Sequence, residues 1–125
     1  MTGNPIRWFE IYVKDMERAK KFYSTVLACE LKPLVKSTEL ELWQFPSNME
    51  KYGSSGALAK MNGFDGGGGN TVLIYFASDD CGVEEKRVVA AGGKIQRPKM
   101  SIGEYGFITL AYDTEGNMFG VHSMA

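Results

Sequence analysis

The two halves of this chain repeat one order of predicted elements: strand, helix, strand, strand, strand. In the first half, apolar residues at every second position predict a strand over 6–13. Asp15 is predicted to cap the N-terminus of the helix that follows. In the second half, "TVLIYFAS" predicts a strand, and "DDCGVEEKRVVAAGG" predicts a helix that Gly92 or Gly93 ends. Neither half is long enough to bury a sizeable core by itself, so we expect a tandem duplication whose halves pack together.

Three further strands are predicted after each helix. They cover residues 30–35, 39–45 and 56–61 in the first half, and 94–97, 107–112 and 118–123 in the second. Pro33 lacks a backbone N–H, which predicts that its strand lies at a sheet edge or contains a bulge. The turn "DTEGN" at 113–117 joins the last two strands as a hairpin.

The first helix carries an apolar stripe at intervals of three and four residues, which predicts the face that it buries. The stripe consists of Met16, Ala19, Tyr23, Val26 and Leu27.

The segment "NGFDGGGGN" separates the two halves. Four consecutive glycines favour no regular structure, so residues 62–70 are interpreted as a linker. The chain is thus predicted to be one domain of two modules, 1–61 and 71–125. The glycines do not form a phosphate-binding loop, because no Lys-Ser/Thr pair follows them and they do not open a helix.

Composition excludes several classes of function. The formal net charge of the 125 residues is −1 with both signs scattered, so no nucleic-acid partner is expected. No apolar run could span a bilayer, and "MTGNPIRWFE" lacks the order of a signal peptide, which makes the cytoplasm the expected location. Cys29 and Cys81 lie far apart and form no CxxC pair, which excludes a zinc site of several thiolates.

The segments "VKDMERAKKFYSTVL" and "DTEGNMFGVHS", in this doubled order, resemble the vicinal oxygen chelate superfamily. That superfamily includes glyoxalase I, bleomycin-resistance proteins, extradiol dioxygenases and fosfomycin-resistance enzymes, and the resemblance covers nearly the whole chain. "WFEI" and "GNMFGVHS" are most similar to its glyoxalase-like members. The resemblance implies an α+β fold in which tandem βαβββ modules form curved mixed sheets around a cavity. It also implies a homodimer.

Metal-dependent members of the superfamily hold one divalent ion with His, Gln or Glu side chains from four strands. The resemblance places these four positions at Trp8, Ala57, Leu73 (or Val72, if Asp79 opens the second helix) and Gly120. None of these residues can ligate a cation, so we expect the usual metal site to be absent and predict no cofactor. Lewis-acid chemistry of the family's kind, glyoxalase I activity included, is therefore not expected.

Two ionisable residues lie two positions from these sites. Strand alternation puts Glu10 on the face of Trp8 and His122 on the face of Gly120. We therefore predict that Glu10 and His122 line the cavity, where they bind a polar group or act as base and acid. The alternatives are that His122 is a surface or packing residue, and that Glu10 pairs with a basic side chain, Arg7 or Lys14, across a dimer contact.

Aromatic residues are predicted to line the same cavity and to suit a planar or cationic ligand. They are Trp8, Tyr12, Trp43 and Tyr75, with Tyr105 in a loop at the rim. The alternative for the first four is that they are ordinary core aromatics, and the loop "SIGEYGF" is either a ligand gate or a simple turn.

Three functions follow from these residues. The favoured one is a metal-independent glyoxalase-like protein that binds a small aromatic or amphipathic molecule, for sequestration or carriage. The second is a lyase or isomerase that uses Glu10 as base, with His122 as acid. The third is a metalloenzyme whose relocated site contains Glu10 and His122.

Overall fold

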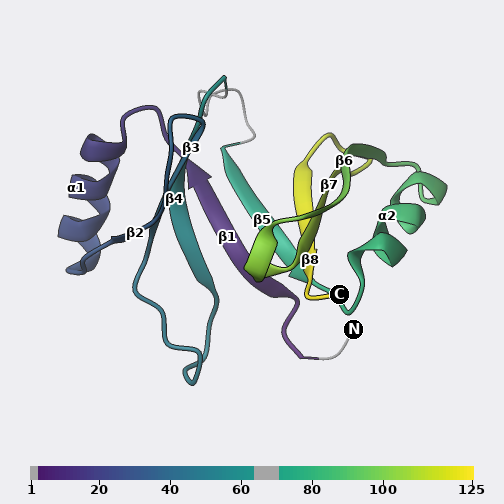
Figure 1. Ribbon diagram of the computed structural model, residues 1–125, viewed down its shortest axis with the longest axis horizontal. Coiled ribbons are helices and arrows are strands. Elements are labelled where there is room, and N and C mark those ends of the chain that lie inside the picture. The colour runs from purple at the N-terminus through teal and green to yellow at the C-terminus, as the bar shows by residue number, and fades with distance from the viewer. Residues whose placement is uncertain (1–2, 64–70) are drawn as a thin grey trace. The chain divides into compact units, whose positions relative to one another are not determined.

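The computed structural model describes residues 3–63 and 71–125 (Figure 1). Apart from Asn62 and Gly63, the linker predicted at 62–70 lies outside the described residues. The chain divides into two compact units, Trp8–Leu73 and Met1–Arg7 together with Ile74–Ala125. No helix among the described residues is long and apolar enough to cross a membrane.

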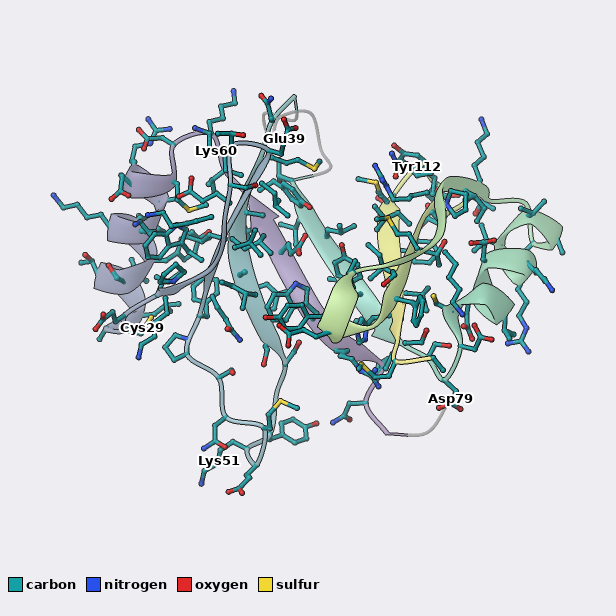
Figure 2. The ribbon with its side chains drawn as sticks, viewed as in Figure 1. Cys29, Glu39, Lys51, Lys60, Asp79 and Tyr112 are labelled. Carbon is teal, nitrogen blue, oxygen red and sulfur yellow. The ribbon has the colours of Figure 1, made fainter. Side chains whose placement is uncertain are left out.

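The unit Trp8–Leu73 contains one helix and a four-stranded mixed sheet. Its elements are β1 (Ile6–Tyr12, whose first two residues belong to the other unit), α1 (Met16–Leu27), β2 (Lys32–Lys36), β3 (Leu40–Gln44) and β4 (Ser55–Met61). The strand order is β2-β3-β4-β1, with β1 parallel to β4 and the other pairs antiparallel. The loop between β3 and β4 extends beyond the sheet, with Lys51 near its tip (Figure 2).

The second unit repeats this arrangement. Its elements are β5 (Val72–Ala77), α2 (Cys81–Ala90), β6 (Lys94–Ser101), the short 3₁₀ helix η1 (Gly103–Tyr105), β7 (Phe107–Tyr112) and β8 (Met118–Ser123). Strand β5 is parallel to β8, and the order continues β5-β8-β7-β6 through antiparallel pairs. The two βαβββ modules and the mixed character of their sheets are therefore confirmed.

Local signals in the sequence explain where both helices begin. The carboxylate of Asp15 accepts the N–H of Arg18 at 3.0 Å, and that of Asp80 accepts the N–H of Gly82 at 2.9 Å. Each aspartate thus satisfies one backbone donor that the first helical turn leaves unpaired. Gly92, with a φ of +99°, follows the end of α2, as its sequence predicts.

Strands β2 and β6 accommodate prolines in the same way. Each is the edge strand of its unit, and the pairing register shifts at Pro33 in β2 and on either side of Arg97 in β6. Pro33 is therefore both at an edge and at a bulge, as predicted. The predicted end of β6 at residue 97 is wrong, because the irregular edge tolerates Pro98 and the strand continues to Ser101.

The core of the unit Trp8–Leu73 lies on both faces of its sheet. Under α1, Met16, Leu31 and Leu58 form a buried cluster that confirms the start of the predicted stripe. The prediction that the stripe extends to Val26 and Leu27 is wrong, because these side chains are 62% and 56% exposed in the last helical turn.

Candidate functional site

Strand β1 carries three polar or aromatic side chains on the sheet face opposite α1. The indole N–H of Trp8 donates to one oxygen of the Glu10 carboxylate at 3.0 Å, and the phenol of Tyr12 donates to the other at 2.7 Å. Glu10 is 8% exposed. We call Trp8, Glu10 and Tyr12 the Glu10 row. Both Glu10 partners stand two residues away, where strand alternation places them on the same face.

The buried residues next to the Glu10 row are apolar. Glu10 is opposite Ala57 and Tyr12 is opposite Ala59 in the parallel pairing of β1 and β4, and both alanines are fully buried. Leu42 of β3 completes this cluster. Alanine methyl groups offer no hydrogen bond, so the carboxylate depends on its two neighbours along β1 for partners.

This environment changes the acidity of Glu10. Burial raises the pKa of the Glu10 carboxyl, and the hydrogen bonds from Tyr12 and Trp8 offset only part of that rise. Among the described residues, no Lys or Arg side chain forms an ion pair with it. A carboxyl of raised pKa exchanges a proton closer to neutral pH, which suits either a general base or a group that binds a hydrogen-bonding ligand.

Glu10→Gln should increase the free energy of unfolding at neutral pH. Because the pKa of Glu10 is higher in the folded state than in the unfolded state, its protonation stabilises the fold. This contribution is complete below the pKa of the unfolded state and is lost as pH rises through the pKa of the folded state. Glutamine stays neutral, and its amide group can form hydrogen bonds with both Trp8 and Tyr12. Urea unfolding from about pH 4 to pH 8 should show the advantage of the variant growing with pH. A difference that is constant or shrinks as pH rises would contradict the raised pKa.

Trp43 lies on the other face of the same sheet. It pairs with Leu58 in β4 and packs in the cluster under α1, whereas Trp8 and Tyr12 pack in the cluster of Leu42. Its indole N–H donates to Glu41 at 2.7 Å, and the Lys20 ammonium lies 3.3 Å from its ring centroid. The structure therefore does not bring Trp43 together with the Glu10 row, and the alternation in "ELELWQFP" alone could not have decided this.

Tyr75 occupies the place in the second module that Glu10 occupies in the first. Each stands five residues before a helix N-cap, and each faces the equivalent strand partner, Ala57 or Gly120. The Tyr75 ring covers Gly120, since a Cβ built on Gly120 would lie 2.3 Å from Cδ1 of the ring. Gly120 is therefore required to leave space for an aromatic ring, and no side chain at this position fits beside Tyr75.

His122 is held by two partners within the second unit. Its Nδ1 lies 3.2 Å from Nη1 of Arg7, and its Nε2 lies 2.5 Å from the carbonyl oxygen of Tyr105. Arginine only donates and a carbonyl only accepts, so in this arrangement Nδ1 accepts from Arg7 and Nε2 donates to Tyr105. Both ring nitrogens are engaged, and His122 would have to leave a partner before it could act as acid, base or metal ligand. The phenol ring of Tyr105 is half exposed in η1.

Arg7 has a different partner in the structure from the one that the sequence suggested. The sequence offered it as an alternative partner of Glu10, whereas the structure pairs it with His122, 115 positions away in the chain. No local pattern connects two residues at that separation; only the pairing of strands could have revealed it.

The four family ligand positions do not fit a metal ion. Trp8 uses its indole N–H on Glu10, Ala57 and Leu73 present buried apolar groups, and Gly120 is covered by a ring. Across residues 3–63 and 71–125, no three His, Cys, Asp or Glu side chains gather into a possible metal site. These residue types do not fit the divalent ion of the family's metal-dependent members. The absence of a cofactor itself stays a prediction.

Sequence and fold together define the class of the protein. The Glyoxalase/Bleomycin resistance protein/Dioxygenase superfamily model matches residues 6–121, and the chain belongs to that superfamily. A comparison with curated proteins gave no match.

Solved structures with the same fold are distant in sequence. Methylmalonyl-CoA epimerase of Streptomyces coelicolor, in complex with 2-nitronate-propionyl-CoA, is 14% identical with a TM-score of 0.71, and 99% of each chain is covered. The Mycobacterium tuberculosis methylmalonyl-CoA epimerase is 12% identical with a TM-score of 0.68, covering 100% of this chain and 93% of the other. A hypothetical protein of Bacillus halodurans C-125 is 9% identical with a TM-score of 0.71, covering 98% and 95%. At these identities the likeness establishes the fold alone.

Proposed function

We propose that this protein binds a small aromatic or amphipathic molecule against the Glu10 row and sequesters or carries it. One observation carries the proposal: a buried carboxyl stands between an indole and a phenol, beside a cluster of buried apolar residues. Trp8 and Tyr12 supply flat apolar surface, and Ala57 and Ala59 on the paired strand carry only methyl side chains. Glu10 supplies the polar contact that orients a ligand carrying an N–H, O–H or cationic group.

A second function, an isomerase or lyase with Glu10 as base, is favoured by two observations. The pKa of Glu10 is raised, and two of the three solved structures described above are named as epimerases, a class of isomerase. In this reaction the Glu10 carboxylate takes a proton from a carbon next to a carbonyl group, the C–H electron pair moves into an enolate, and the proton is returned in the next step. The engagement of both His122 nitrogens weighs against His122 as the second proton carrier.

A thermal-shift screen of aromatic amines, phenols and amphipathic thioesters tests both functions. A true ligand should raise the melting temperature of the wild type. Glu10→Gln should weaken its binding about tenfold or more, because the variant loses a charge-assisted contact. Glu41→Gln is the matched control, since Glu41 also accepts an indole N–H but lies on the opposite face. It should leave binding unchanged.

The fate of the ligand separates the two functions. Recovery of unchanged ligand after long incubation supports sequestration or carriage. Product formation, reduced at least about a hundredfold by Glu10→Gln with the fold intact, supports the enzyme. Equal binding and equal turnover by wild type and Glu10→Gln would reject the Glu10 row as the site.

The homodimer and the cytoplasmic location belong to the same proposal. They rest on the family resemblance and on the residue pattern, and light scattering of the purified chain measures the first directly.

A further inference from the structure

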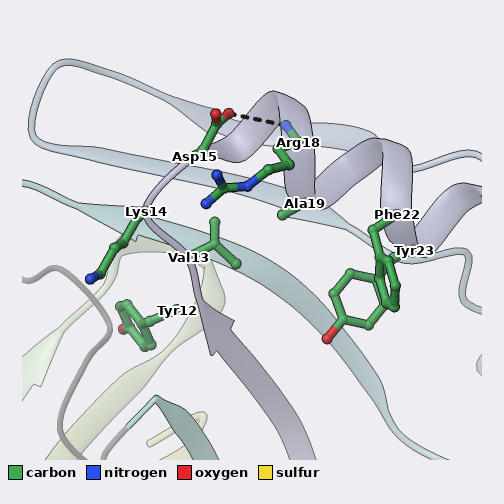
Figure 3. A pocket seen from close by; sticks show the side chains of 8 residues that line it. All are labelled: Tyr12, Val13, Lys14, Asp15, Arg18, Ala19, Phe22 and Tyr23. Carbon is green, nitrogen blue, oxygen red and sulfur yellow. Dashed lines mark hydrogen bonds between the residues drawn. The ribbon is translucent and has the colours of Figure 1, made fainter.

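An open hollow of about 420 Å³ lies where β1 passes into α1 (Figure 3). Its volume is within the range of small-molecule pockets. Val13 and Ala19 form its apolar middle, and it lies within the unit Trp8–Leu73. The Tyr12 ring lines the hollow while its phenol group bonds to Glu10, so the hollow borders the Glu10 row without including the carboxyl.

One end of the hollow is basic. Lys14 and Arg18 both line it, and neither side chain forms a hydrogen bond or an ion pair within the described residues. The lining includes one carboxylate, Asp15, whose oxygen accepts the backbone N–H of Arg18 as the helix cap (Figure 3). The lining therefore has a net positive charge, and two cationic donors are available to an anion.

The other end of the hollow is aromatic. Phe22 follows Arg18 by four residues on α1, which puts the ring one turn, about 6 Å, along the helix axis from the guanidinium-bearing residue. Tyr23 packs edge-on against Phe45 at 5.8 Å and is fixed in the core. Phe22 meets Tyr23 edge-on at 5.1 Å but is 58% exposed, so most of its surface is available for contact.

We propose that this hollow binds an amphipathic organic anion. The anionic head lies between Lys14 and Arg18, and the apolar body covers Val13 and Ala19 and stacks on Phe22. The separation of basic and aromatic ends by one helical turn suits a ligand whose acidic group is attached directly to an aromatic or short alkyl body. The site is distinct from the Glu10 row, where a carboxylate would repel an anion, and it does not depend on the function proposed above.

Two fluorescent probes of nearly equal shape test this assignment. Anilinonaphthalene sulfonate carries the anionic head, and N-phenylnaphthylamine has the same rings without it. Lys14→Gln/Arg18→Gln should weaken the sulfonate about tenfold and leave the neutral probe nearly unchanged. The control Lys21→Gln/Lys32→Gln removes two exposed cations outside the hollow and should affect neither probe. Phe22→Ala should weaken both probes, with the helical circular dichroism retained.

Each outcome of these binding measurements either supports or overturns the anion site. Loss of sulfonate binding in the Lys14/Arg18 variant alone, together with weaker binding at higher salt, supports the anion site. No sulfonate binding by the wild type, or equal loss in the control variant, overturns it. Unchanged binding after Phe22→Ala also overturns it, because the aromatic end would then play no part.

Discussion

Leu58→Ala should lower the free energy of unfolding by about 2–5 kcal/mol. Leu58 is fully buried at the centre of β4, where it packs with Met16 of α1 and Leu31. Truncation leaves a cavity between the helix and the sheet that strand pairing on both sides of β4 prevents from closing. Urea unfolding followed by circular dichroism measures the loss.

The matched control is Leu27→Ala. Leu27 is 56% exposed at the end of α1, so its truncation should change the free energy of unfolding by less than about 0.5 kcal/mol. Equal losses in the two variants would mean that the cluster under α1 is not the core of this unit.

Gly120→Ala should destabilise the protein by about 1–3 kcal/mol although it adds only one methyl group. That methyl would lie 2.3 Å from a ring carbon of Tyr75, well inside van der Waals contact, so the ring or the strand must move. Tyr75 is buried and pairs directly with Gly120 across β5 and β8, which leaves the ring little space to rotate away.

A double-mutant cycle isolates this contact. In a Tyr75→Leu background, where the smaller side chain makes room, Gly120→Ala should cost less than about 1 kcal/mol. An equal loss of unfolding free energy in both backgrounds would show that Gly120 is required by the backbone conformation and not by the space that the Tyr75 ring needs.

Much of the fold was predictable because its signals are local. The caps Asp15 and Asp80, the edge proline Pro33, and the turn at 113–117 each act through neighbours within a few residues. The exposed end of the α1 stripe was not predictable, since an apolar residue is buried only if another element reaches it.

The candidate site also has a part that local signals predict and a part that they do not. The Glu10 row could be grouped from alternation alone, because its members stand at positions 8, 10 and 12 of one strand. What satisfies the carboxyl was not evident: the sequence offered Arg7 or Lys14 across a dimer contact as an alternative, whereas the hydrogen bonds within the chain come from the adjacent indole and phenol. Trp43 and the pair of Arg7 with His122 depend on strand pairing across the sheets, which no local pattern contains.

The indole N–H signals of the protein give the most direct test of the Glu10 row as a ligand site. The chain has two tryptophans, each donating to a glutamate, Trp8 to Glu10 and Trp43 to Glu41, on opposite faces of one sheet. Two-dimensional ¹H–¹⁵N spectra, assigned with Trp43→Phe, should show the Trp8 signal shifting as ligand is added while the Trp43 signal stays in place. A ligand that moves the Trp43 signal and leaves Trp8 unchanged would contradict the proposed site.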